Sequence, residues 1–455
     1  MTRSIPAQKG AIEAKELPLH YREIATLPSD WDICLLQDVL TSISNGLTAP
    51  QSADQDGIPV TRIETIASDR VDPQRVRYIK NLDRTTLERY RLRTGDILLS
   101  HINSEPQIGR AVLYSGNPPT LLHGMNLLRL QVDARRCDPE FLVYLFKLYR
   151  SLGVFRGLAT RAVGQSSINQ GRLKAVAIPL PPVEEQRAIA RLLRAVDTSI
   201  EAAEEVIEAT RQLKRSLARH LFKYGPMPPA ESDRGELQET GIGQIPEHWS
   251  LMLFRDILSE PLRNGHSARR ASSGDGVRTL TLSAVTNDDF SLANTKVTEA
   301  DPDRVRDLWL RQGDILIERA NTRELVGTAA LYEGPEKFAI YPDLVIRARV
   351  QEPVVNPKFV VEFLRTQVAR AYFQRNSRGA AGNMPKIGHG IIETLSLPVP
   401  SLDEQRVIAQ ILTSVDLKAK AEILRREALS QLFRSLISEI MSGQRRVGQL
   451  EKINA

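Results

Sequence analysis

A long predicted helix occurs twice in this chain, and the repetition limits the folds that the chain can adopt. The first copy lies in residues 178–222, after three prolines that cannot continue a helix or a central strand. Apolar residues from Ile189 to Ile207 then alternate at spacings of four and three, which is typical of a coiled-coil seam. A helix about 60 Å long, at about 1.5 Å per residue, cannot bury such a seam alone. It therefore requires a partner helix.

The partner helix is predicted in the same chain. Residues 397–441 repeat the proline-punctuated start, the aliphatic ladder and a Val-Asp pair. The matched tripeptides at the two helix starts are Glu185, Gln186 and Arg187 in the first copy and Glu404, Gln405 and Arg406 in the second. Two long helices with similar seams predict an intramolecular antiparallel coiled coil. The alternative is that each helix packs only on its own globular domain.

The repetition extends beyond the helices. Trp31 and Gly95 have counterparts in Trp249 and Gly313, each 218 positions further along the chain. One tandem duplication explains this constant offset. Segments 45–91 and 265–305, in contrast, share little sequence. Two copies of one scaffold that carry different inserts indicate two binding surfaces with different preferences.

We therefore predict an α+β protein in which two tandem α/β domains are separated by two long, mutually similar helices. Between them, residues 224–243 are rich in Gly, Pro and acidic residues, as in a linker. The expected parts are a loosely ordered N-terminal arm (1–26), a first domain (27–181), a central helix (182–224), a linker (225–243), a second domain (244–400), a distal helix (401–442) and a C-terminal tail (443–455). Within the first domain, residues 60–66 are predicted to form a strand.

Composition narrows the class of protein. The 455 residues are 42% hydrophobic and 25% charged, as in ordinary globular proteins. A net charge of +6 and a pI of about 9.3 permit a nucleic-acid partner. Two distant cysteines, Cys34 and Cys137, imply neither a disulfide framework nor a cysteine-based zinc site. The start lacks the apolar core of a signal peptide and no stretch has membrane-spanning length, so we expect a cytoplasmic protein.

The motifs of common catalytic sites are missing from the sequence. It contains no P-loop, no Gly-x-Ser-x-Gly elbow and no His-Glu-x-x-His motif. Asn117, Pro118, Pro119 and Thr120 partly match the Asn-Pro-Pro-aromatic motif of amino-methyltransferases. Threonine replaces the aromatic residue, however, and no Gly-rich cofactor loop lies upstream, so a turn between strands is the better interpretation. We expect a non-enzymatic chain.

Basic and amide-rich loops occur at matched places in the two halves. Loop 100–109 corresponds to loop 318–327, and loop 159–169 to loop 378–387. Arginine and lysine suit guanine edges and phosphates, while asparagine and glutamine suit adenine. For any single residue, a solvated loop side chain is an equally good interpretation. The candidate DNA contacts are Asn103, Arg110, Arg161, Gln165, Ser166, Asn169, Arg269, Arg270, Arg319, Asn321, Arg323, Arg378, Asn383 and Lys386.

This duplicated order resembles the specificity (S) subunit of type I restriction–modification enzymes. The resemblance runs from Trp31 to about Met441, and its main carriers are the two Gly-Asp-Ile-Leu turns at Gly95 and Gly313 and the two Glu-Gln-Arg helix starts. It implies two target recognition domains, each of which reads one half of a gapped double-stranded DNA site. This sequence departs from the family's pattern in the N-terminal arm and in the plain Ala-Ala-Gly loop at Ala380–Gly382.

The same resemblance implies the partners. Two methyltransferase subunits would dock around the helices, with the two Glu-Gln-Arg tripeptides as candidate docking residues. They would methylate adenine N6 with S-adenosylmethionine, and a motor-nuclease subunit could add cleavage driven by ATP and Mg²⁺. No cofactor or metal is expected on this chain.

Three other functions remain open at this stage. The chain could serve a related restriction class with a fused nuclease-methylase. It could be a self-contained methyltransferase or nuclease, although the missing cofactor motif counts against this. It could also be a coiled-coil adaptor that binds only proteins.

Overall fold

The computed structural model describes residues 12–162, 164–228, 230–231, 235–272, 274–379 and 384–448. The chain forms two compact units. Unit 1 contains the residues up to Ala203 together with those from Arg425 onward, and unit 2 contains Glu204–Leu424. In the described part of the chain, no helix combines the length and apolar character needed to cross a membrane.

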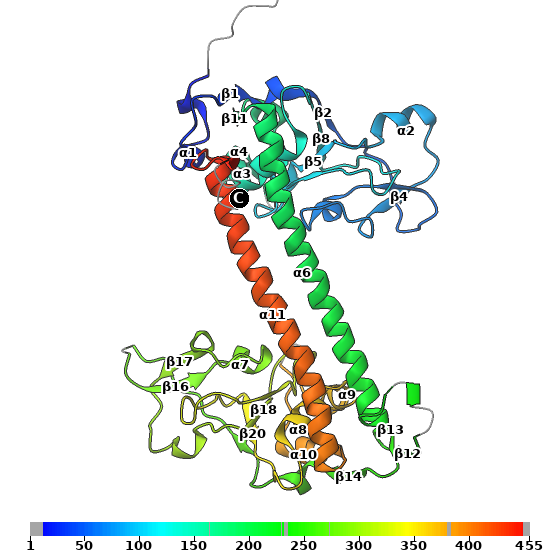
Figure 1. Cartoon of the computed structure of the whole chain (residues 1–455), viewed down its shortest axis with the longest axis vertical. Helices are drawn as coiled ribbons and strands as arrows, with labels where there is room; N and C mark the ends of the chain where they lie inside the picture. The colour runs from blue at the N-terminus through cyan, green and yellow to red at the C-terminus, as the bar shows by residue number, and fades with distance from the viewer. Residues whose placement is uncertain are drawn as a thin grey trace, which may run out of the picture. The chain divides into compact units, whose positions relative to one another are not determined.

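The chain contains two long helices, α6 (Val183–Tyr224) and α11 (Leu402–Met441). One part of each helix belongs to unit 1 and the other part to unit 2. Within each unit the two halves lie side by side and run in opposite directions, as an antiparallel coiled coil (Figure 1). In unit 1, Ile189 of α6 and Ile440 of α11 belong to one buried cluster. In unit 2, the Nζ atom of Lys214 lies 2.6 Å from a carboxylate oxygen of Asp416. The predicted coiled coil and fold class are confirmed.

Unit 1 is built on an antiparallel sheet in the order β2-β8-β5-β7, with helix α3 packed against it. The strands of unit 1 are β1 (Asp32–Leu35), β2 (Leu40–Asn45), β3 (Ile58–Val60), β4 (Arg77–Ile79), β5 (Ile97–Ser100), β6 (Ile102–Asn103), β7 (Ala111–Leu113), β8 (Leu127–Val132), β9 (Thr160–Ala162), β10 (Gln165–Ser167) and β11 (Ala177–Leu180). Its shorter helices are α1 (Leu19–Arg22), α2 (Arg84–Tyr90), α3 (Pro139–Ser151), α4 (Val154–Leu158) and α5 (Gln170–Lys174). Strand β1 pairs with β11, which leads directly into α6.

Unit 2 repeats this plan with a sheet in the order β15-β20-β18-β19. Its strands are β12 (Leu237–Thr240), β13 (Gly243–Pro246), β14 (Ser250–Leu253), β15 (Arg263–Asn264), β16 (Val277–Leu280), β17 (Thr295–Thr298), β18 (Ile315–Glu318), β19 (Ala329–Leu331), β20 (Val345–Ala348) and β21 (Ser396–Val399). Its shorter helices are α7 (Leu282–Thr286), α8 (Pro357–Leu364), α9 (Gln367–Asn376) and α10 (His389–Glu393). Strand β14 pairs with β21, which leads into α11.

Helices α3 and α8 begin in the same way because their sequences carry the same capping signal. The side chain of Asp138 accepts hydrogen bonds from the backbone N–H groups of Glu140 and Phe141, each at 3.0 Å. The side chain of Asn356 does the same at the start of α8. A proline follows each cap, where its fixed φ suits the first helical turn.

The dissimilar inserts share a backbone plan that their sequences do not reveal. Hairpin β3–β4 in the first insert and hairpin β16–β17 in the second are antiparallel pairs at matching positions in the two repeats. The predicted strand over residues 60–66 is wrong beyond Val60, because residues 63–66 form a 3₁₀ turn. The hydroxyl of Thr65 accepts a hydrogen bond from the Arg62 N–H at 2.8 Å, which holds that turn.

Residues 12–26 of the N-terminal arm and strand β12 of the linker have a defined structure. Leu17 and Tyr21 are buried in the core of unit 1, and the Tyr21 hydroxyl donates to the Met441 carbonyl at 2.5 Å. Aromatic burial therefore orders this segment. In the linker, β12 forms a hairpin with β13, which begins at Gly243 with a φ of +105°.

The Tyr21 contact predicts a measurable loss of stability. We expect Tyr21→Ala to lower the free energy of unfolding by about 3–5 kcal/mol, since it removes a buried aromatic ring. Tyr21→Phe should cost only about 1 kcal/mol, for the lost hydrogen bond. Urea unfolding followed by circular dichroism measures both. Leu19→Ala, at a position that is 58% exposed in the same helix, is the control; equal losses for Leu19 and Tyr21 would contradict the assignment.

Candidate nucleic-acid interface

A small three-stranded ribbon lies next to the end of strand β5 in unit 1. Its strands follow the order β6-β10-β9, with Ser166 opposite both Asn103 and Arg161. In unit 2, backbone bridges join Lys386 to Ala320 and to Arg378 in the same way. We call this feature the ribbon in both units. Two loops that are about 60 residues apart in sequence thus come together at the same place in each unit.

The exposed side chains of the two ribbons differ in chemistry. Arg161 and Gln165 are exposed in unit 1, whereas Arg378 and Lys386 are exposed in unit 2. Arg161 pairs with Glu105 at 3.0 Å, but its side chain remains 74% exposed. Such a surface pair contributes at most about 1 kcal/mol, so a phosphate or base edge could replace the carboxylate. Ser166 is buried within its ribbon, unlike Arg161 and Gln165, and its role as a DNA contact stays a prediction.

The two asparagines at the start of the matched loops shape the backbone. The side-chain amide of Asn103 donates to the Ser100 hydroxyl at 3.0 Å and its oxygen accepts from the Ser104 N–H at 2.8 Å. The amide of Asn321 donates to a carboxylate oxygen of Glu318 at 2.6 Å and accepts from the next backbone N–H. Both amides therefore fix the loop turn.

Glu318 supports its loop from inside the protein. Burial raises the pKa of its carboxyl group, while hydrogen bonds from Thr286 and Asn321 act in the opposite direction. Ser100 occupies the equivalent place in unit 1. Neither Ser100 nor Glu318 is among the predicted contacts, although each begins one of the matched loops.

Arg110 is held inside unit 1. Its guanidinium pairs with Asp69 at 3.1 Å and donates to the Gln107 side chain at 2.7 Å and to the Ala67 carbonyl. Burial lowers its pKa, and its side chain is only 13% exposed. The guanidinium of Arg110 therefore bonds within unit 1, and its role as a DNA contact stays a prediction.

The remaining candidates lie in varied settings. Asn169 is exposed but caps α5, accepting from the Gly171 N–H at 2.7 Å. Arg319 is partly buried, and Arg323 is exposed in the loop after β18. Arg269 and Arg270 are exposed at the edge of hairpin β16–β17, where Arg270 bridges to Thr298. Asn383 lies outside the described residues.

A buried glutamine fixes the start of each long helix. The Gln186 amide donates to the carbonyls of Pro181 at 2.7 Å and Arg136 at 3.1 Å, and its oxygen accepts from the Asp138 N–H at 2.8 Å. Gln405 makes the equivalent three bonds in unit 2, with the Pro400 and Val354 carbonyls and the Asn356 N–H. Both side chains are fully buried and bonded within the chain, and their role in docking stays a prediction.

The glutamate before each glutamine also bonds within the chain. Glu185 accepts from the Trp31 indole N–H at 3.1 Å and pairs with Arg446 at 2.5 Å. Glu404 accepts from the Trp249 indole N–H at 3.2 Å and pairs with His248 at 3.0 Å. Burial raises the pKa of Glu404, but the hydrogen bonds from His248, Trp249 and Ser401 outweigh this and lower it below its ordinary value.

The arginines of the two tripeptides point outward. Arg187 is exposed, and Arg406 is exposed with an ion pair to Asp403 at 2.9 Å. Of the six predicted docking residues, these two therefore present their side chains at the surface. The described residues contain no group of three or more His, Cys, Asp or Glu side chains that could hold a metal ion.

The chain matches the family model described as "Type I restriction modification DNA specificity domain" over residues 28–210 and 283–428. It is 33% identical to a protein of Methanocaldococcus jannaschii named as the MjaX type I restriction enzyme specificity subunit, over 95% of this chain and 98% of that one. It is 26% identical to the EcoKI specificity subunit of Escherichia coli over 54% and 52% of the two chains. The fold is similar to the crystal structure of the S subunit from M. genitalium, with a TM-score of 0.59, 16% identity, and coverage of 91% and 97%.

The buried glutamine predicts a contrast between adjacent residues. We expect Gln186→Leu to lower the free energy of unfolding by about 3 kcal/mol, because it leaves three buried backbone groups without partners. Arg187→Ala should change it by less than about 0.5 kcal/mol, as for other surface positions. Chemical denaturation of both variants tests this. A loss for Arg187→Ala as large as that for Gln186→Leu would show that the helix start is held in another way.

Proposed function

This chain belongs to the family of type I restriction–modification DNA specificity subunits, and we propose that each of its two units reads one half of an interrupted DNA target. The ribbons carry this proposal. The same backbone feature occurs in both units with different exposed side chains, Arg161 and Gln165 in one and Arg378 and Lys386 in the other. Arg, Lys and Gln are the side chains that hydrogen-bond base edges and phosphates.

The coiled coil acts as the spacer between the two readers. A rigid element of fixed length sets the separation of two DNA half-sites, as it does in other two-site DNA-binding proteins. The net charge of +6 supplies the sequence-independent attraction to phosphates, and this attraction weakens as salt rises. Base contacts at the ribbons supply the choice of sequence.

In this proposal the partner subunits catalyse methylation and restriction. Two methyltransferase subunits dock on the two similar faces that the duplication creates, since identical partners bind similar surfaces. Arg187 and Arg406 are the exposed candidates for this docking. The partners bind S-adenosylmethionine and methylate adenine at N6, and a motor-nuclease subunit with ATP and Mg²⁺ carries out restriction. This chain itself is non-catalytic and binds no cofactor.

Methylation mapping tests this function directly. The chain is expressed with its neighbouring methyltransferase in a host that lacks other adenine methylation, and modified bases are located by sequencing the genome. We expect an interrupted motif with a modified adenine in each half, which disappears when this chain is omitted. Absence of chain-dependent methylation, with both proteins expressed and folded, would contradict the proposal.

Variants of the ribbon test the division of labour between the units. Arg161→Ala should alter preference in one half of the motif, and Lys386→Ala in the other, each by about 1–3 kcal/mol for a lost base contact. Binding of the assembled complex to DNA sets that vary one half-site measures this. Equal weakening on every sequence, with a salt slope reduced by about one, would instead mark a phosphate contact.

Arg135→Ala is the matched control for Arg161→Ala. Arg135 follows β8 at the end of the sheet opposite the ribbon, and its side chain is 89% exposed. Its loss should leave sequence preference unchanged. A change equal to that of Arg161→Ala would mean that general charge, rather than the ribbon, controls recognition.

A further inference from the structure

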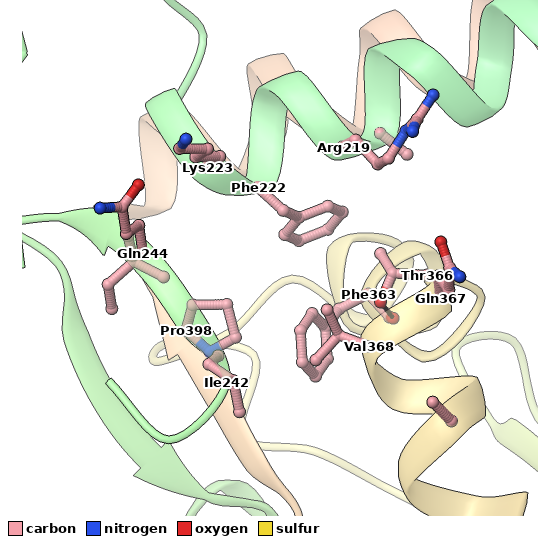
Figure 2. Close-up of a pocket in the computed structure, with 13 residues that line it drawn as sticks. Arg219, Phe222, Lys223, Ile242, Gln244, Phe363, Thr366, Gln367, Val368 and Pro398 are labelled. Atoms are coloured by element: carbon pink, nitrogen blue, oxygen red, sulfur yellow. Dashed lines mark hydrogen bonds between the residues drawn. The ribbon is translucent and has the colours of Figure 1, made fainter. Parts of the chain in front are cut away.

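An open apolar pocket lies in unit 2 at the C-terminal end of α6 (Figure 2). Its volume is about 440 Å³, and α6, β13, α8, α9 and Pro398 of strand β21 contribute to its walls. The rings of Phe222 and Phe363 lie 5.5 Å apart on one side, and Ile242 and Pro398 face them. Val368, at the rim, is 41% exposed. Apolar surface of this kind is favourable to cover.

The equivalent place in unit 1 is filled by the chain itself. Met441 lies 219 positions after Phe222, and Tyr149 lies 218 positions before Gln367 of the pocket, as the offset of the duplication requires. Between them Tyr21 is fully buried: its ring lies 5.3 Å from that of Tyr149, and its hydroxyl donates to the Met441 carbonyl. Residues 13–24 thus cover this place in unit 1, and we call them the plug.

In the described part of unit 2, no segment fills the corresponding pocket. The counterpart of Tyr21 at the same offset is Glu239, which is exposed in strand β12. Strand β12 pairs with β13, and the Glu239 carboxylate accepts from the Gln244 side chain at 2.6 Å. The hairpin therefore forms one wall of the pocket, through Ile242 and Gln244, and does not fill it.

Positive charge borders the pocket. Arg219 and Lys223 line it from α6, and among the described residues neither forms an ion pair with a carboxylate. Lys223 instead lies 4.8 Å from the ring of Tyr224. Charges of opposite sign on a partner would favour this site and fix the orientation of binding.

We propose that this pocket is a docking site for a short segment of a protein partner, in which an aromatic side chain enters beside Phe222 and flanking carboxylates face Arg219 and Lys223. The aromatic ring takes the place that Tyr21 takes in unit 1. The duplication supplied this place twice, and the described residues fill it in unit 1 but leave it open in unit 2. This inference concerns protein docking and stands independently of the DNA-reading role of the ribbons.

Synthetic peptides test the proposal on the full chain. The first probe is a fluorescently labelled peptide with the sequence of residues 13–24, which is the plug of unit 1. The second carries Arg22→Glu, and the third Tyr21→Ala. We expect saturable binding in fluorescence anisotropy, at least about threefold tighter for the Arg22→Glu peptide and at least about tenfold weaker for the Tyr21→Ala peptide.

Variants of the protein locate the binding. Ala371→Trp fills the pocket and Val368→Lys places a charge at its rim, so each should weaken binding of the first peptide at least about tenfold. Leu292→Trp, at a position that is 63% exposed elsewhere in unit 2, is the control and should leave binding unchanged. Val368→Lys changes an exposed position, so it keeps the test valid if Ala371→Trp does not fold.

Three outcomes would overturn the proposal. One is absence of saturable binding to the wild-type chain. Another is binding that survives both pocket variants, because the peptide would then sit elsewhere, for example at the corresponding place in unit 1. The third is tighter binding of the native peptide than of the Arg22→Glu peptide, together with self-association of the chain. That result would assign the pocket to the N-terminal segment of a second copy.

Discussion

A buried glutamine amide at the start of each long helix sets the direction in which that helix leaves its globular unit. Gln186 bonds three backbone groups in two segments: the Pro181 carbonyl in the turn before α6, and the Arg136 carbonyl and Asp138 N–H at the start of α3. A buried amide that satisfies three backbone groups is costly to disrupt, because each group would otherwise lie unpaired in the core. The contact therefore ties the start of α6 to the start of α3.

The same constraint operates in both repeats, although the surrounding residues differ. Arg136 in unit 1 is replaced by Val354 in unit 2, yet both supply only a backbone carbonyl. Asp138 and Asn356 both cap the following helix with a side-chain oxygen while their N–H groups bond to the glutamine. Contacts made through the backbone tolerate such substitutions, and this explains how two diverged sequences keep one geometry.

The sequence predicted the architecture well because the signals that carry it are long. The duplication, the coiled-coil periodicity and the two-helix design are each spread over many residues, and the structure confirms the fold class. Short features were harder. The three-residue strands β3 and β4 have no usable periodicity, so the shared plan of the inserts was invisible.

The sequence indicated which loops form the candidate site, but not what each side chain in them contacts. Matched loops identified the ribbons, and Arg161 and Lys386 are exposed there. Sequence alone could not show that Arg110 would be paired with Asp69, or that Gln186 would be buried, because both facts depend on segments that are distant in the chain. Tyr21 was missed for the same reason: its partner, Met441, lies 420 positions away.

The residues that hold the loops and ribbons in shape differ from the exposed ribbon residues that are proposed to contact DNA. The loop turns are held by Asn103 and Asn321, and the ribbons by backbone pairing, so the fold does not depend on which side chains the ribbon exposes. Exposed ribbon positions can therefore change while the scaffold remains. Under the proposed function, a chain of this design would acquire a new target in one half-site while the other unit and the coiled coil stay as they are.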